Sequence, residues 1–93
     1  MLTLKDFEKA YDKVQEVVRS THLVRSEVFS EASGNNVYLK PENMQLSGAY
    51  KIRGAYYKIS TMSDEDREKG LITASAGNHA QGVAYAAREY GVR

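Results

Sequence analysis

The chain has 93 residues, the length of one small domain. Its 13 basic and 12 acidic residues leave a net charge of +1, which gives no electrostatic reason to expect binding to nucleic acid or to an anionic membrane. Cysteine is absent and the two histidines lack metal-ligand spacing, so neither a disulfide framework nor a metal site is expected. No apolar run is long enough for a signal-peptide core or a membrane span, and a soluble cytoplasmic protein is the default expectation.

The N-terminal segment predicts an amphipathic helix that runs to about Arg19. Thr3 and Asp6 resemble a capping box. Apolar residues then recur at spacings of three and four, which is the pattern of one helix face. These residues are Leu4, Phe7, Tyr11, Val14 and Val18. The opposite face is charged, so the helix should lie on a surface.

A hairpin is expected next. Residues 28–32 are compatible with a strand, residues 33–36 form a turn cluster, and residues 37–40 are again prone to form a strand. Pro41 cannot donate a hydrogen bond to a strand ladder and should end the second strand or lie at an edge.

Two helices should follow the hairpin. The first is predicted to begin near Ser47 or Gly48, and its buried stripe should consist of Ile52, Ala55, Tyr56, Ile59 and Met62. The second is short, is capped by Ser63 and is stopped by Gly70. Its acidic residues come first and its basic residues last, as the helix dipole favours.

The C-terminal part predicts a strand, a tight connection and a helix. Residues 71–74 are a compact apolar run suited to a buried parallel strand, and residues 92–93 would begin the next strand. The helix between them should end at Gly91 and pack closely on the sheet through small residues. These are Ala80, Val83, Ala84 and Ala87. A parallel sheet needs more strands, so we expect the front end of a larger α/β protein with an incomplete open parallel sheet.

The loop from Ser75 to His79 has the features of an anion site. Unpaired backbone N–H groups at a helix start favour negative charge, and ligands of open α/β sheets bind beyond the carboxyl ends of the strands. Asn78 adds an amide that can donate and accept, and His79 can carry a proton. The alternative is that Gly77 and Asn78 only make a turn and that His79 is a surface residue.

Lys51 lies at a helix start, where the dipole disfavours a cation, and Arg53 follows two residues later. A lysine in such a place is usually solvated and without a chemical role. However, a lysine attacks carbonyl groups only when neutral, and positive neighbours, a helix start and burial all lower the pKa of a lysine. The position is therefore one that a Schiff-base lysine needs, with Arg53 acting in the same direction.

Two tracts carry a resemblance to a known family. KPENMQLSGAYKIRGAYYKI and SAGNHAQGVAYAA, in this order and spacing, resemble the N-terminal part of threonine ammonia-lyases (threonine dehydratases). These enzymes belong to the fold-type II pyridoxal-phosphate family, which includes tryptophan synthase β, and the resemblance runs from about Val37 to Arg93. It implies conversion of L-threonine, and of L-serine, to a 2-oxo acid and ammonia. It also implies an amino-acid substrate and a homo-oligomeric parent, a dimer or a tetramer.

The resemblance also implies roles for single residues. Lys51 would hold pyridoxal 5'-phosphate covalently and would then remove the α-proton of the substrate. Tyr50 would lie beside the cofactor ring, and Asn78 would donate a hydrogen bond to the cofactor's 3′-oxygen. The substrate carboxylate would be bound by the loop of Ser75, Ala76, Gly77, Asn78 and His79.

Small differences bear on the choice of reaction. Serine racemases usually carry a serine at the position of Ala76, so this alanine favours the dehydratase, and serine racemase is the alternative. Threonine synthases and cysteine synthases usually place an acid directly after the lysine, where this chain has Ile52. Ala49 departs from the serine of many relatives. A non-catalytic paralogue is a third reading, and nucleotide binding is disfavoured because GxGxxG and Walker patterns are absent.

The glycine-rich loop with which the family binds the cofactor phosphate has no counterpart here, since the seven glycines are never adjacent. Residues 1–93 are therefore expected to be an N-terminal fragment of the catalytic domain and to be inactive alone.

Overall fold

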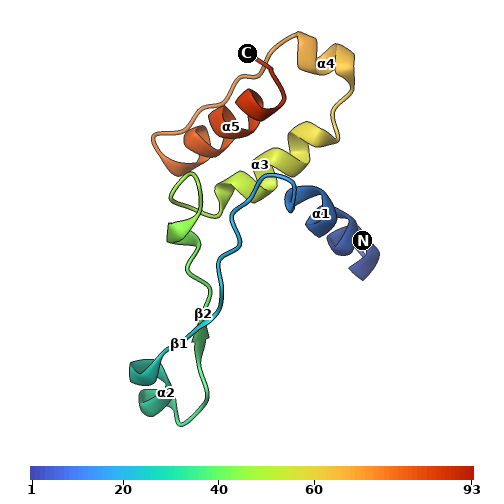
Figure 1. Cartoon of the computed structure of the whole chain (residues 1–93). Helices are drawn as coiled ribbons and strands as arrows, with labels where there is room; N and C mark the ends of the chain where they lie inside the picture. The colour runs from blue at the N-terminus through green and yellow to red at the C-terminus, as the bar shows by residue number, and fades with distance from the viewer.

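The computed structural model describes residues 1–93, which form five α-helices, one 3-10 helix and two short strands. Figure 1 shows that α1, α3, α4 and α5 gather at one end, while β1, α2 and β2 form an arm that extends from it. The Cα radius of gyration is 16.1 Å, against about 12 Å for a compact domain of this length. None of the helices has the length and apolar character that a membrane span requires.

Helix α1 covers Leu4–Val14 and begins as predicted. The backbone N–H of Thr3 donates to the Asp6 carboxylate over 2.7 Å, which confirms the capping box. The helix ends at Val14, earlier than the predicted end at Arg19, and turns continue the chain. Val14 is the buried residue of the helix, whereas Phe7 and Tyr11 are largely exposed. The predicted apolar face exists, but Val14 is its only buried member.

The arm contains the only sheet. Strand β1 (Val24–Arg25) pairs antiparallel with β2 (Tyr38–Leu39), and Val24 lies opposite Leu39. Helix α2 (Glu27–Ser33) connects the two strands. The second predicted strand is thus confirmed over its central residues.

The first strand of the predicted hairpin is wrong, because residues 28–32 lie inside α2. The local cause is good helix capping at both ends. The Ser26 hydroxyl accepts a hydrogen bond from the backbone N–H of Phe29 over 3.3 Å, and Gly34 ends the helix with a φ of 68°. A left-handed residue at that place is the usual helix stop. The strand that does pair with β2 precedes the helix.

The core lies between α3 (Lys51–Ser60) and α5 (Asn78–Glu89). The predicted stripe of α3 is confirmed, with four of its members buried and Met62 partly buried. The buried residues of the two helices are Ile52, Ala55, Tyr56 and Ile59 on α3, and Gly82, Ala86 and Ala87 on α5. The face predicted for α5 is partly wrong, since Ala84 is exposed. The prediction assumed that α5 packs on a sheet, whereas here its buried face is turned to α3.

Helix α4 (Asp64–Glu68) has the predicted cap and stop. The Ser63 hydroxyl accepts from the backbone N–H of Asp66 over 3.1 Å, and Gly70 has a φ of 84°. A 3-10 helix, η1 (Glu42–Met44), precedes α3.

Residues 71–74 are not a strand in this structure, contrary to the prediction. Their only backbone hydrogen bond is donated by Leu71 N–H to the carbonyl of Arg93 over 2.7 Å, and Ile72 is fully exposed. A strand needs a partner along its length, and a single bond does not make a ladder. The bond does place residues 71 and 93 side by side, as neighbours in a parallel pair would be.

Helices α3 and α5 approach so closely that any side chain at position 82 would be crowded by the backbone of α3. A Cβ on Gly82 would lie 3.1 Å from the backbone N of Ile52 and 3.3 Å from the Cβ of Lys51. The two helices begin at the same end of the pair (Figure 1). The close contact therefore holds the first turn of α3 against α5, one turn from the start of α5.

We expect Gly82→Ala to lower the free energy of unfolding by about 1 to 3 kcal/mol, because the added methyl group meets backbone atoms that cannot rotate away. The matched control is Gly54→Ala, since Gly54 is also helical and a Cβ there meets nothing within 4 Å. This control should be neutral or stabilising, by up to about 1 kcal/mol. Thermal and urea unfolding of both variants measure the difference, and equal stabilities would contradict the close contact.

Candidate functional site

Lys51 is the first residue of α3 and is exposed. The helix was predicted to begin near Ser47 or Gly48, but Gly48 has a φ of 71°, which an α-helix does not accommodate. Instead, the backbone N–H of Gly48 donates to the carbonyl of Gln45 over 2.8 Å and closes a turn that leads into Lys51. The chain thus presents Lys51 at the exit of a tight loop.

Tyr50 is the neighbour of the lysine amine. The Lys51 Nζ lies 5.3 Å from the centre of the Tyr50 ring, within the range of a cation–π contact. Tyr50 as a whole is 60% exposed. An amine and an open aromatic face are therefore side by side at the start of α3.

The start of α5 offers unpaired donors. The backbone N–H groups of Asn78, His79 and Ala80 have no acceptor in the chain, and that of Gly77 donates to the Ser75 hydroxyl over 3.2 Å. Three free donors at the positive end of a helix dipole are the elements of an anion site. Asn78 is one helical turn, or about 6 Å along the axis, from the Gly82 contact with Lys51. Residues 75–79 are all exposed, Ala76 included.

His79 belongs to a groove that Lys51 does not line. It lines an apolar groove between α3 and residues 71–73, together with Lys58 and Thr73. Lys51 does not line this groove. The structure thus brings Lys51, Tyr50 and the backbone of the α5 start to one end of the helix pair, and it shows no contact between His79 and the lysine.

Arg53 is not the positive neighbour of Lys51 that the sequence suggested. Its Nε and Nη2 atoms donate to the two carboxylate oxygens of Glu42 over 2.8 and 2.9 Å. The pair is partly buried, with 15% of the Glu42 side chain and 30% of the Arg53 side chain exposed. Residues two apart on a helix do not share a face, so the charge of Arg53 is directed away from Lys51 and is neutralised.

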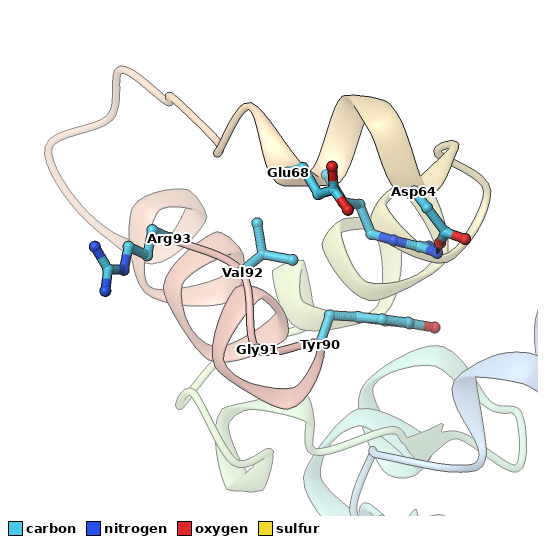
Figure 2. A pocket seen from close by; sticks show the side chains of 7 residues that line it. Asp64, Glu68, Tyr90, Gly91, Val92 and Arg93 are labelled. Atoms are coloured by element: carbon cyan, nitrogen blue, oxygen red, sulfur yellow. Dashed lines mark hydrogen bonds and ion pairs between the residues drawn. The ribbon is translucent and has the colours of Figure 1, made fainter.

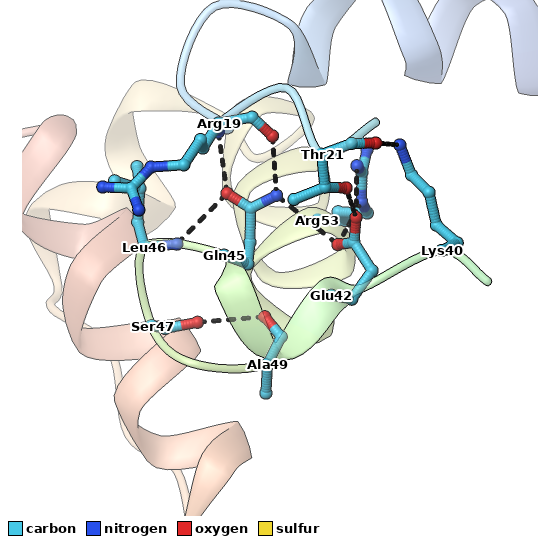
Figure 3. A network of polar contacts seen from close by, with 9 residues as sticks. All are labelled: Arg19, Thr21, Lys40, Glu42, Gln45, Leu46, Ser47, Ala49 and Arg53. Atoms are coloured by element: carbon cyan, nitrogen blue, oxygen red, sulfur yellow. Dashed lines mark hydrogen bonds and ion pairs between the residues drawn. The ribbon is translucent and has the colours of Figure 1, made fainter. Parts of the chain in front are cut away.

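Glu42 stands at the centre of a polar network that sequence reasoning missed (Figure 3). Besides the two bonds from Arg53, it accepts one from the Thr21 hydroxyl over 2.6 Å. Gln45, which is buried, accepts from the backbone N–H of Arg19 over 2.7 Å and donates to the carbonyl of Arg19 over 2.9 Å. The network joins residues 19–21, the loop before Lys51, and α3.

The tract KPENMQL contained Glu42 and Gln45, but no periodicity marks either residue as buried. Their partners lie 11 to 26 residues away in the chain. A single sequence carries no signal for pairings of that range, so both residues received no role.

A second hollow lies away from Lys51, between α4 and the C-terminal residues (Figure 2). The Tyr90 ring lies 5.1 Å from the Tyr56 ring and 5.3 Å from the Arg67 guanidinium, measured between centres. Arg67 also pairs with Asp64 and donates to the carbonyl of Ile59. These contacts join α3, α4 and the end of α5. Glu68 and Arg93 also line the hollow, and neither forms an ion pair.

The Arg53 guanidinium lowers the pKa of the Glu42 carboxyl from its ordinary value of 4.5 to about 2, and the Thr21 hydroxyl acts in the same direction. A depressed pKa means that the ionised form is favoured in the folded state. The resulting stability is complete above pH 4.5 and is lost as the pH falls toward 2.

We expect Glu42→Gln to remove up to about 3 kcal/mol of stability at neutral pH and to flatten the stability curve between pH 4.5 and pH 2. The control is Glu27→Gln, since Glu27 also pairs with an arginine, Arg25, but keeps 71% of its side chain exposed. It should change stability by less than about 1 kcal/mol. Urea unfolding across this pH range measures the free energy of unfolding of each variant. Parallel plots of this free energy against pH for the unmodified chain and Glu42→Gln would refute the role of the pair.

The residues at the shared end of α3 and α5 fit the cofactor that the resemblance implies. A carbonyl group needs one accessible amine, which Lys51 supplies, and a planar ring needs an open aromatic face, which Tyr50 supplies. Because Gly82 has no side chain, the Cβ of Lys51 lies close to the α5 backbone. The free backbone N–H groups at the start of α5 can bind a carboxylate. No comparable cradle for a phosphate group is present in the chain.

Comparison with known proteins gives a consistent result. The family model described as "Pyridoxal-phosphate dependent enzyme" matches residues 14–93. The L-threonine ammonia-lyase of Thermotoga maritima is 51% identical over 92 residues, which cover 99% of this chain and 23% of that protein. The chain thus spans about a quarter of the length of that curated relative.

Two solved structures resemble this one closely. A threonine deaminase from T.th. matches with a TM-score of 0.84 at 37% identity, and the match covers 98% of this chain and 32% of that one. The serine racemase of Dictyostelium discoideum matches with a TM-score of 0.91 at 34% identity, and the match covers 99% of this chain and 30% of that one.

Proposed function

Because this chain belongs to the family of pyridoxal-phosphate dependent enzymes, we propose that it supplies the cofactor lysine and the substrate-carboxylate loop of an L-threonine ammonia-lyase. The observation that carries the proposal is the contact of Lys51 with α5 at Gly82, one turn from the unpaired N–H groups of that helix. The remaining parts of the enzyme would come from a polypeptide of the length of its relatives.

Lys51 has two tasks in this proposal. Its Nζ binds the cofactor covalently, and the same atom, once free, takes the α-proton of the substrate. Bound pyridoxal phosphate supplies an electron sink for the charge left at the α-carbon. Tyr50 lies next to Nζ and provides an aromatic face for the ring, while the Asn78 amide provides a donor for the cofactor's 3′-oxygen.

The start of α5 orients the substrate. The free backbone N–H groups of Asn78, His79 and Ala80 bind the α-carboxylate, and Ser75, Ala76 and Gly77 complete the loop around it. The carboxylate is thereby fixed about one helical turn from the Gly82 contact with Lys51. The two packed helices hold the substrate carboxylate and the lysine at fixed positions. The α-hydrogen of the substrate is thereby directed toward Nζ.

Serine racemase is the second candidate, and the TM-score of 0.91 with the Dictyostelium discoideum enzyme is the observation in its favour. The ammonia-lyase is preferred because of the 51% identity with the Thermotoga maritima protein and because position 76 is alanine. An alanine there has no hydroxyl that could deliver a proton to the opposite face of the substrate.

The lysine is tested in a complete enzyme, made by joining residues 1–93 to the remainder of the Thermotoga maritima relative. We expect Lys51→Ala to lower the rate of 2-oxobutanoate formation from L-threonine by at least about 10²-fold, because it removes the base. Lys58→Ala, an exposed lysine on the same helix, should keep the rate. Borohydride reduction and peptide mapping should find the cofactor on Lys51, and a label on Lys40 or Lys58 instead would disprove the assignment.

The choice of reaction is tested with L-serine in the same enzyme. We expect pyruvate and ammonia to be the main products and D-serine to form slowly, because Ala76 cannot act as an acid. Chiral chromatography measures both products over time. D-serine formed faster than pyruvate would favour the racemase.

A further inference from the structure

The first turn of α3 is held from two opposite sides. On one side, the Cβ of Lys51 faces α5 at Gly82, where no side chain intervenes. On the other side, the guanidinium of Arg53 is bound by both carboxylate oxygens of Glu42. Positions 51 and 53 are about 200° apart around a helix, so the two contacts oppose each other across its axis.

The Glu42 carboxylate is held in place by contacts with residues outside α3. Its carboxylate also accepts from the Thr21 hydroxyl over 2.6 Å. The loop that carries it is held through Gln45, whose amide binds both backbone polar groups of Arg19. The carboxylate is therefore tied to the segment after α1, and α3 is tied to the carboxylate.

A bidentate contact sets a rotation as well as a distance. Two parallel hydrogen bonds between a guanidinium and a carboxylate have one preferred plane, which a single contact does not have. Turning α3 about its axis would break that plane and would move the Lys51 stem along the α5 backbone. Arg53 also lines the groove between α1 and α3, which limits its freedom further.

We propose that Glu42 is a positioning residue for Lys51, acting through its bidentate contact with Arg53 to set the rotation of the first turn of α3 against α5. The inference rests on the proposed function, because it concerns the atom that binds the cofactor and takes the proton. Neither Glu42 nor Arg53 needs to touch substrate. A misplacement of about 1 Å in a reacting group can cost about 10²-fold in rate.

The test compares Glu42→Gln, Arg53→Gln and the double variant in the full-length enzyme that carries this chain. Each should lower kcat by about 10²-fold and keep KM for L-threonine within about threefold, because substrate binding at the α5 start is not altered. The double variant should be no worse than either single variant. The matched control is Ile59→Ala, which removes a buried side chain about two turns from Lys51 on the same helix and leaves the contact between Glu42 and Arg53 intact.

Ile59→Ala should lower the melting temperature at least as much as Glu42→Gln, while keeping kcat within about threefold of the unmodified enzyme. A purely structural role of Glu42 predicts instead that both variants lose activity in proportion to their lost stability. That result, or a Glu42→Gln enzyme with unchanged kcat, would overturn the proposal.

A second readout does not depend on turnover. Each variant is incubated with pyridoxal phosphate and reduced with borohydride, and the label on Lys51 is divided by the label on Lys58 of the same helix. The ratio should fall in Glu42→Gln and Arg53→Gln and be retained in Ile59→Ala. If the unmodified enzyme labels Lys51 but forms no 2-oxobutanoate, the proposed reaction fails, and this ratio alone still supports or overturns the positioning role.

Discussion

The close contact of α3 and α5 at Gly82 is the constraint on which the rest of the structure depends. It allows Ile52, Ala55 and Ala86 to be buried between two helices that begin at the same end. Because both helices begin there, the first turn of one, with its amine, and the first turn of the other, with its free N–H groups, become neighbours. The packing of the core and the composition of the site are thus consequences of the same contact.

Two kinds of interaction position the helices around this contact. Apolar packing sets the distance between the helices, and it is not directional. The Glu42 network is directional, and it connects the loop before Lys51 to a segment that lies more than twenty residues earlier in the chain. A catalytic lysine needs both, since its distance from the substrate and its direction must each be correct.

The elements predicted best from the sequence were those with local causes. The stripe of α3 follows from helical spacing, and the cap at Ser63 and the stop at Gly70 follow from residue type. The error at residues 28–32 also has a local cause, because the helix cap at Ser26 was overlooked and the helix stop at Gly34 was interpreted as part of a hairpin turn. The strand at residues 71–74 needed a partner along its length, and the pairing of Glu42 with Arg53 needed the tertiary fold. Neither can be read from nearby residues.

The central claim is that Lys51 and the start of α5 form one site for the cofactor and the substrate carboxylate. The most direct measurement is a crystal structure of the full-length enzyme with pyridoxal phosphate and a non-reacting analogue of L-threonine. Our account predicts that, without the analogue, density joins the cofactor to Lys51 Nζ. With the analogue, its carboxylate should lie at the backbone N–H groups of Asn78 and His79. A cofactor joined to another lysine, or a carboxylate bound away from the start of α5, would contradict the account.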